Sequence, residues 1–339
     1  MRRRLGSLGL LVALALAVFA VGCGGDDNDK SSNTGTGSSA STGTDNVDLT
    51  QGSNLTFAMV THSDEGSFWS VVKKGAQQAS KDEGTKLIWS PSNNDPQKEA
   101  QLISAAVSQK VDGIAVSVPN ADAIKGALAK AKAAGIPIIT LNSGVDDFKD
   151  LGAITHVGQS EGIAGEAAGE KLKAAGAKKV LCVIHEQNNI GLQQRCDGVK
   201  KGFGGDVTNV QVKGTADVAT TQTEIKSKLQ ADKSFDAVIA LNPDIAVAAV
   251  TAAKGASSDA KIATFDITPA VLKDIKAGTV LFAVDQQQYL QGYLPIVFLK
   301  LFKENANTVG GGQPVLTGPG FVDKSNAATV EKLAAAGTR

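Results

Sequence analysis

Residues 281–293, LFAVDQQQYLQGY, change from apolar to polar within a single step of the chain. Val280 and residues 281–284 form a short apolar run that is typical of a strand buried on both faces. One carboxylate, Asp285, and three carboxamides at 286–288 follow this run directly. The segment therefore predicts a buried strand whose carboxyl end delivers polar side chains to one edge of a sheet.

Similar apolar runs recur along the chain, with helical patterns between them. The predicted strands cover 55–60, 86–90, 113–118, 136–141, 154–158, 179–184, 237–241, 261–265 and 280–284. Alanine-rich segments with helical spacing separate them, for example 97–109 and 122–135, and several of these end at a glycine, as helices commonly do. This alternation predicts an α/β protein with parallel sheets that are covered by helices on both faces.

Polar side chains follow nearly every predicted strand. In parallel sheets, ligands bind beyond the carboxyl ends of the strands, so these side chains are candidates for one site. Carboxylates, carboxamides, a guanidinium and two aromatic rings together suit a small, neutral, hydroxyl-rich ligand. The candidates are His62, Asp64, Phe68, Trp69, Asn142, Ser143, Glu186, Arg195, Asn242, Asp266, Asp285 and Gln286.

The N-terminal residues have the pattern of an export signal followed by a tether. Three arginines at 2–4 precede an apolar run that ends in Ala20-Val21-Gly22-Cys23, and small residues before a cysteine are typical of lipoproteins. We expect 1–22 to be a lipoprotein signal peptide, Cys23 to be lipidated, and 23–52, which is rich in Gly, Ser and Thr, to be a disordered tether. Ordinary secretion with cleavage nearby is the alternative.

Charge, length and cysteine content narrow the class of protein further. The chain has 34 basic and 34 acidic residues, and no basic stripe that would indicate nucleic-acid binding. Residues 53–339 exceed what one hydrophobic core usually serves, which favours two lobes. Cys182 and Cys196 remain once Cys23 is assigned, and in an exported protein such a pair predicts a disulfide, although two buried free thiols are the alternative.

The order and spacing of several motifs resemble the type I periplasmic sugar-binding proteins of bacterial import systems, the ribose- and galactose-binding group. The motifs are FWSVVKKGAQQA (68–79), AGIPIITLNSG (134–144), HVGQSEGIAGEAAGEKL (156–172), QRCDG (194–198), ALNPDIAVAAV (240–250), TFDIT (264–268) and DQQQYLQGY (285–293). The resemblance implies two Rossmann-like lobes joined by three hinge crossovers, with 53–158 and 286–317 in the N-terminal lobe and 159–285 and 318–339 in the C-terminal lobe.

The resemblance also implies a function. It suggests a monomeric binder, not an enzyme, without cofactor or metal, that holds a sugar or polyol between its lobes and delivers it to an ABC permease at the outer face of the cytoplasmic membrane or in the periplasm. The residues that match the contacts of the family are Phe68, Trp69, Asn142, Arg195, Asn242, Asp266 and Gln286, with His62, Asp64, Ser143, Glu186 and Asp285 as further candidates.

Some positions depart from the ribose-binder pattern and leave the identity of the ligand open. Asn142-Ser143 stands where that pattern has Asp-Arg, His62 and Asp64 alter the first loop, and Val118 stands where an asparagine is expected. After the last strand, we expect Tyr289 and Tyr293 to pack against the lobe, and Gln287 and Gln288 to be solvated.

Other functions fit the sequence less well. Gly158–Gly162 matches the G-x-S-x-G elbow of serine hydrolases, with Ser160 as nucleophile, but only His185 follows it in the chain order that such enzymes need. There is no G-x-G-x-x-G turn after the first strand and no Walker motif. The same core also occurs in regulators of the lac-repressor type, which the export signal disfavours. A sensing role, in which the protein presents a sugar to a membrane receptor or histidine kinase, stays open.

Overall fold

The structure, a computed structural model, describes residues 54–339, and its strands form two six-stranded sheets. The predictions for the signal peptide (1–22), for Cys23 and for the tether (23–52) lie outside the described residues. The first sheet contains Thr56–Thr61 (β1), Lys86–Pro91 (β2), Gly113–Ser117 (β3), Ile138–Asn142 (β4), His156–Gly158 (β5) and Val315–Leu316 (β11), in the order β11-β5-β4-β3-β1-β2. The second contains Lys179–Ile184 (β6), Asp206–Gln211 (β7), Ala237–Ala240 (β8), Lys261–Phe265 (β9), Val280–Asp285 (β10) and Gly320–Asp323 (β12), in the order β12-β10-β9-β8-β6-β7.

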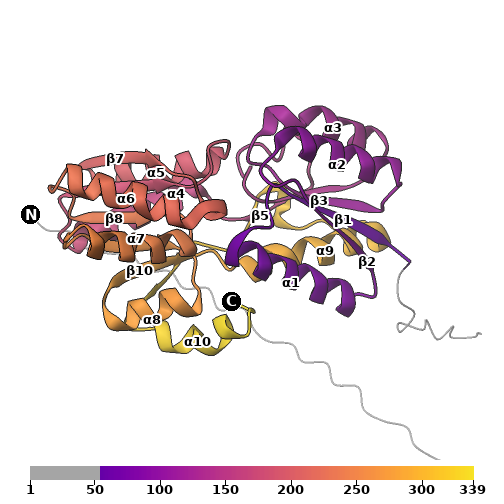
Figure 1. Ribbon diagram of the computed structural model, residues 1–339. Coiled ribbons are helices and arrows are strands. Elements are labelled where there is room, and N and C mark those ends of the chain that lie inside the picture. Colours follow the sequence, from indigo (N-terminus) through magenta and orange to yellow (C-terminus); the bar gives the residue numbers. More distant parts are fainter. Residues whose placement is uncertain (1–53) are drawn as a thin grey trace, which may run out of the picture. The chain divides into compact units, whose positions relative to one another are not determined.

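Helices cover both faces of each sheet (Figure 1). The first sheet carries Gly66–Asp82 (α1) and Gln288–Asn305 (α9) on one face, and Pro96–Ser108 (α2) and Ala121–Ala133 (α3) on the other. The second carries Glu161–Ala174 (α4) and Ile190–Phe203 (α5) on one face, and Val218–Ala231 (α6), Pro243–Gly255 (α7), Pro269–Ala277 (α8) and Ala327–Ala335 (α10) on the other. Short 3-10 helices span Thr215–Asp217 (η1) and Gly310–Gly312 (η2). We call each sheet with its helices the first and the second lobe.

The period of the strands explains why each sheet is covered twice. Along β1, Phe57 and Met59 pack under α1 and α9, whereas Ala58 and Val60 pack under α2 and α3. All four side chains are fully buried. Successive side chains of a strand point to opposite faces, so a strand that is apolar at every position needs a helical layer on each side.

The chain passes between the lobes three times. The crossings follow β5, at 159–160, and β10, at 286–287, and the last joins β11 to β12 through 317–319. Neighbouring strands are parallel in both sheets, except that β12 runs antiparallel to β10. The predicted fold class, two parallel α/β lobes joined by three crossovers, is confirmed.

All nine predicted strands form, and three short or polar strands were missed. In β7, only Val210 is buried, so its sequence has no apolar run, and β11 and β12 are two and four residues long. All three are edge strands of their sheets, where fewer side chains are buried and the sequence shows no regular apolar pattern. No helix described within 54–339 is long and apolar enough to cross a membrane.

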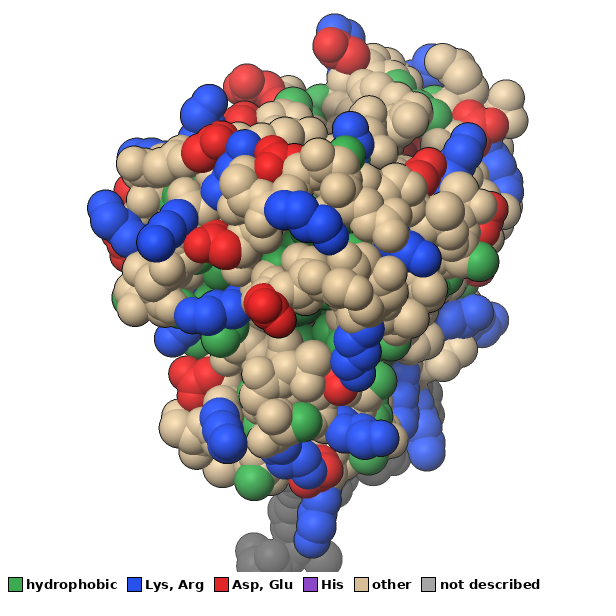
Figure 2. Space-filling model, turned by 60° about the vertical axis from the view of Figure 1, so that its left-hand side comes forward, with side chains coloured by type: hydrophobic (Ala, Val, Ile, Leu, Met, Phe, Trp, Pro, Cys, Tyr) green, Lys and Arg blue, Asp and Glu red, His purple; other side chains and the backbone are tan. Residues whose placement is uncertain are grey.

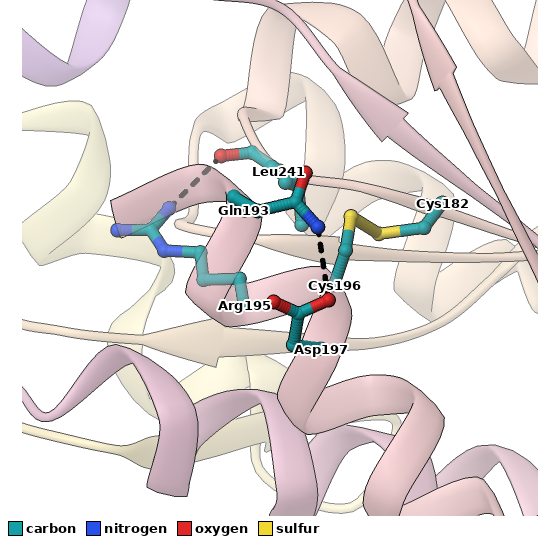
Figure 3. The surroundings of a disulfide bond; sticks show 6 residues. All are labelled: Cys182, Gln193, Arg195, Cys196, Asp197 and Leu241. Carbon is teal, nitrogen blue, oxygen red and sulfur yellow. Dashed lines mark hydrogen bonds between the residues drawn. A yellow bond between two sulfur atoms is a disulfide. The ribbon is translucent and has the colours of Figure 1, made fainter. Parts of the chain in front are cut away.

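The predicted disulfide is confirmed and joins β6 to α5 (Figure 3). The Cα atoms of Cys182 and Cys196 lie 5.9 Å apart, and both side chains are fully buried. Cys196 directly follows Arg195 on α5, so the bond fixes the part of the helix from which the guanidinium projects.

Two glycine positions decide how closely α1 and α9 pack. A Cβ atom on Gly292 of α9 would lie 1.9 Å from the carbonyl oxygen of Val72, and one on Gly75 of α1 would lie 2.2 Å from that of Tyr289. Tyr289 and Tyr293 pack beside this contact with stacked rings, and the Tyr293 hydroxyl donates to Asp82 of α1, as expected for side chains that pack against the lobe.

We predict that Gly292→Ala lowers the free energy of unfolding by about 1–3 kcal/mol, because the added methyl group forces the two helices apart. Gly126→Ala on α3 is the matched control. A Cβ atom there meets nothing within 4 Å, so the better helix propensity of alanine should raise stability by up to ~1 kcal/mol. Denaturant unfolding of both variants measures the effect, and equal stabilities would show that α1 and α9 do not pack this closely.

Candidate ligand-binding site

A small cavity lies between the two lobes, at the carboxyl ends of their strands. It has a volume of about 30 Å³, and we call it the inner cavity. The first lobe contributes His62, Glu65, Phe68, Trp69 and Asn142 to its wall. The second lobe and the crossing after β10 contribute His185, Glu186, Asn189, Leu192, Arg195, Thr215, Leu241, Asn242, Asp266 and Gln286.

Nine of the twelve candidate residues line this cavity, and three do not. Asp64 is exposed on the first loop. The hydroxyl of Ser143 is hydrogen bonded to the Oδ1 atoms of Asn142 and Asn189, so Ser143 supports lining residues from behind. Asp285 is buried beside the hinge, where it pairs with Arg339 at 2.7 Å. The nine are His62, Phe68, Trp69, Asn142, Glu186, Arg195, Asn242, Asp266 and Gln286.

The expectation that Gln287 and Gln288 are solvated is wrong. The Gln287 amide donates to the carbonyl of Thr317 and accepts from Arg339, and Gln288 is only 1% exposed. The reason is that the second and third crossings lie side by side here, so the carbonyl of Thr317 finds its donor in Gln287.

Arg195 is held in place by a buried ion pair. Its Nε and Nη2 donate to the two carboxylate oxygens of Glu161 at 2.6 and 2.9 Å. Its Nη1 donates to the carbonyl of Leu241 at 3.1 Å, as Figure 3 shows. Glu161 also accepts from Gln159 of the first crossing, at 3.0 Å. The ion pair cancels the charge of Arg195, so the guanidinium offers the cavity a rigid donor rather than an unbalanced positive charge.

Asp266 lines the inner cavity with a buried carboxylate that is only partly hydrogen bonded. It is 2% exposed, its Oδ2 accepts from Gln286 at 3.2 Å, and its Oδ1 has no partner among the described residues. Burial raises the pKa of Asp266 to about 7, against the opposing effect of Arg195. Since buried polar atoms are nearly always hydrogen bonded, Oδ1 is a contact that a ligand would complete.

Two lining residues adopt a backbone conformation that side chains other than glycine rarely adopt. Asn142 at the end of β4 has φ 61°, and Asp266 just after β9 has φ 66°. Asn and Asp tolerate the left-handed region better than other residues. Strain of this kind concentrates at functional sites, where it directs a side chain toward a ligand.

Aromatic rings form the wall on the first lobe. Phe68 and Trp69 at the start of α1 meet edge to face, with centroids 5.1 Å apart, and Trp69 meets His62 in the same way at 4.9 Å. Aromatic faces of this kind suit contact with the C–H groups of a ring-shaped ligand.

Direct hydrogen bonds hold the lobes together around the cavity. Asp244 at the start of α7 accepts from the backbone N–H of Ser67 at 3.1 Å and from its hydroxyl at 3.2 Å. Glu65, the N-cap residue of α1, makes no side-chain cap of its own. A residue of the second lobe therefore caps a helix of the first.

Six lining residues were missed by the sequence interpretation. They are Glu65, His185, Asn189, Leu192, Thr215 and Leu241. Asn189 had a usable signal, because it is the N-cap of α5, where its side chain accepts from Gly191 and donates to Glu186 at 2.7 Å. Thr215 follows β7, which the sequence did not reveal.

The geometry does not support the hydrolase alternative. Ser160 lines a separate cavity with Asp146, Ile163 and Gln194, whereas His185 lines the inner cavity, so the two do not form a nucleophile–base pair. Within residues 54–339, no group of three or more His, Cys, Asp or Glu side chains is arranged to hold a metal ion.

Comparison with known proteins identifies the class to which this two-lobe site belongs. Residues 57–304 match the periplasmic binding protein domain. The chain therefore belongs to the periplasmic binding protein family, whose members are substrate-binding proteins, and the resemblance seen in the sequence is confirmed.

Individual relatives bind different sugars. The chain is 27% identical to the ribose import binding protein RbsB of Haemophilus influenzae. The aligned region of 246 residues covers 71% of this chain and 83% of that protein. It is 26% identical to the D-apiose import binding protein of Actinobacillus succinogenes, over 66% of this chain and 74% of that protein. A solved carbohydrate transporter from Acidothermus cellulolyticus 11B, in complex with myo-inositol, is 45% identical with a TM-score of 0.83, covering 85% of this chain and 100% of that one.

Proposed function

We propose that this protein is an extracytoplasmic solute-binding protein that captures a neutral monosaccharide or polyol between its lobes and delivers it to an ABC-transporter permease. The observation that carries the proposal is the inner cavity, where both lobes present unsatisfied or rigidly held polar groups opposite two aromatic rings. In this assignment, the N-terminal lobe is 53–158 with 286–317, and the C-terminal lobe is 159–285 with 318–339, a division that the membership of the two sheets supports.

The charges around the inner cavity favour a ligand without net charge. Arg195 is neutralised by Glu161. Against the effect of its own burial, Glu186 has a pKa below the usual value because His62, His185 and Asn189 stabilise its charged form, so protein groups already engage its carboxylate. On the face drawn in Figure 2, basic and acidic side chains are interspersed, which gives no support to a nucleic-acid partner.

The proposal includes the absence of catalysis. The strongest polar groups at the inner cavity are tied to other protein groups, as Arg195 is to Glu161 and Gln286 is to Asp266. Such an arrangement suits the recognition of hydroxyls, and the support for the absence of catalysis is the family, whose members are substrate-binding proteins.

We predict that sugars or polyols raise the melting temperature in a concentration-dependent way, because a ligand that binds only the folded state stabilises it. The measurement is a thermal-shift screen over pentoses, hexoses, linear polyols and inositols. We place myo-inositol first, since the relative with 45% identity was solved with it. A screen in which only amino acids or peptides stabilise the protein would refute the assignment.

Asp266→Ala should weaken binding of the best ligand from that screen by about tenfold or more, because it removes an acceptor from a dry cavity and strands Gln286. Asp197→Asn is the control, since Asp197 is exposed on α5 and bonds only Gln193. Titration calorimetry compares the two. Arg195→Ala is a poor probe because it would leave Glu161 buried and unpaired, and Gln288→Ala is a poor control because Gln288 is buried. Unchanged affinity in Asp266→Ala would place the ligand elsewhere.

We further propose that Cys23 is lipidated and anchors the protein to the outer face of the cytoplasmic membrane or within the cell envelope. The support is the apolar run before Ala20-Val21-Gly22-Cys23 and the polar segment after it. The protein is predicted to partition with membranes, and Cys23→Ala to release it into the soluble fraction. Recovery of the unaltered protein in soluble form, with an N-terminus other than Cys23, would remove this claim.

A further inference from the structure

A second and larger cavity adjoins the inner one. It has a volume of about 290 Å³, and we call it the outer cavity. Both lobes line it, with His62, Asn94, Pro96, Glu99 and Pro119 from the first and His185, Glu186, Gln187, Asn188, Asn189, Val212 and Lys213 from the second. Its volume is close to the lower bound of about 300 Å³ for sites that bind small molecules. The inner cavity, at about 30 Å³, has room for about two water molecules, so the lobes must separate before it admits a ring.

Four residues line both cavities and separate them. They are His62, His185, Glu186 and Asn189. Within the second lobe, Asn189 donates to Glu186 at a close 2.7 Å. Across the lobes, His62 Nε2 lies 3.5 Å from both Glu186 Oε2 and Asn189 Nδ2, which is longer than a good hydrogen bond. Of the contacts between these four residues, the longest are therefore those between the lobes. A small movement of the lobes apart would break them and join the two cavities.

Glu99 indicates that the outer cavity is a binding site and not only a solvent-filled entrance to the inner cavity. It belongs to the first turn of α2, is 0% exposed, and neither of its carboxylate oxygens has a partner among the described residues. A buried carboxyl group without partners is costly, so its presence at a cavity wall calls for a ligand. Burial raises the pKa of Glu99 to about 8. At neutral pH the carboxyl group is mostly protonated, and it can both donate to and accept from a hydroxyl.

The rest of the lining also fits a neutral ring. Asn94, Gln187 and Asn188 supply carboxamides, which donate and accept, while Pro96, Pro119 and Val212 supply apolar surface for C–H groups. His185 is neutral, because burial lowers its pKa to about 4, and its Nδ1 atom has no partner among the described residues.

We propose that the outer cavity is a second subsite, which binds a hydroxyl-bearing ring attached to the ring that the inner cavity holds. The ligand class is then a glycosylated polyol or a disaccharide, whose linkage passes between His62 of the first lobe and Glu186 and Asn189 of the second. This proposal rests on the function proposed above and extends its ligand from one ring to two.

The test compares one-ring and two-ring probes by titration calorimetry with the full chain. The pairs are myo-inositol with its galactoside galactinol, galactose with melibiose, and xylose with xylobiose. In at least one pair, the two-ring compound should bind about tenfold more tightly than the single ring, because it adds hydrogen bonds to buried groups. If every two-ring probe binds no better than its single ring, the proposal is wrong.

Two variants test whether the tighter binding of two-ring compounds arises in the outer cavity. Asn188 is exposed at the rim of the outer cavity and does not line the inner one, so Asn188→Trp should fill the subsite and remove the advantage of the second ring, leaving the single ring unchanged. Gln97→Trp is the matched control, on an exposed position of α2 that lines neither cavity. Glu99→Leu should also remove the advantage, and Glu99→Gln, which keeps a donor and an acceptor, should restore most of it.

The outcomes separate this proposal from the function on which it rests. An advantage of two rings that survives both Asn188→Trp and Glu99→Leu would overturn the second subsite alone. Loss of single-ring binding in Asn188→Trp would also overturn it, because the outer cavity would then hold the principal ring. If no sugar or polyol of either size binds, the function proposed above fails first.

Discussion

The buried ion pair between Glu161 and Arg195 is the contact on which the cavity-lining side of the second lobe depends. Both side chains are almost fully buried, and removing either partner of such a pair commonly costs about 3–5 kcal/mol. The pair connects α4, the first helix after the first crossing, to α5. Glycines allow these helices to approach closely, since a Cβ atom on Gly165 would lie 2.2 Å from the carbonyl oxygen of Arg195 itself. With Gln159 bonded to Glu161, the hinge, the ion pair and the ligand-facing guanidinium form one connected unit.

The two lobes present their ligand-facing groups in the same way. β4 and β9 hold the third position in their respective sheets. Each is followed or ended by a short polar residue with positive φ, Asn142 in the first lobe and Asp266 in the second. Gln291 and Gln286 connect the two sides, because Gln291 lies 3.4 Å from Asn142 and donates to Gln286, which donates to Asp266. A polar chain through the second crossing thus joins the two equivalent strand ends.

The periodicity of the sequence was enough to predict parallel α/β sheets, whereas the two lobes followed from the length and the three crossovers from the resemblance. Strand ends were enough to find nine of the fifteen residues that line the inner cavity. Asp266, Asn242 and Asn142 follow apolar runs, so the general position of ligands in parallel sheets brought them together. The same rule failed for Asp285, because its strand ends at a hinge where Arg339, distant in the sequence, takes up the carboxylate. The expectation that Gln288 is solvated was wrong because its burial arises from tertiary packing, which leaves no local pattern in the sequence. Glu99 lies on a helix and looks like an ordinary first-turn acid, so only the three-dimensional structure shows that it is buried without a partner.

The cap that Asp244 places on α1 has a consequence for the aromatic wall. Helices begin with N–H groups that have no partner within the helix, and α1 obtains its side-chain acceptor from the other lobe. When the lobes separate, the amides of this first turn pass to water and the turn is free to fray. Phe68 and Trp69 stand on that turn. The first turn of α1 therefore has its side-chain cap only while the lobes are closed, and amide exchange at Ser67 would report how long each closed interval lasts.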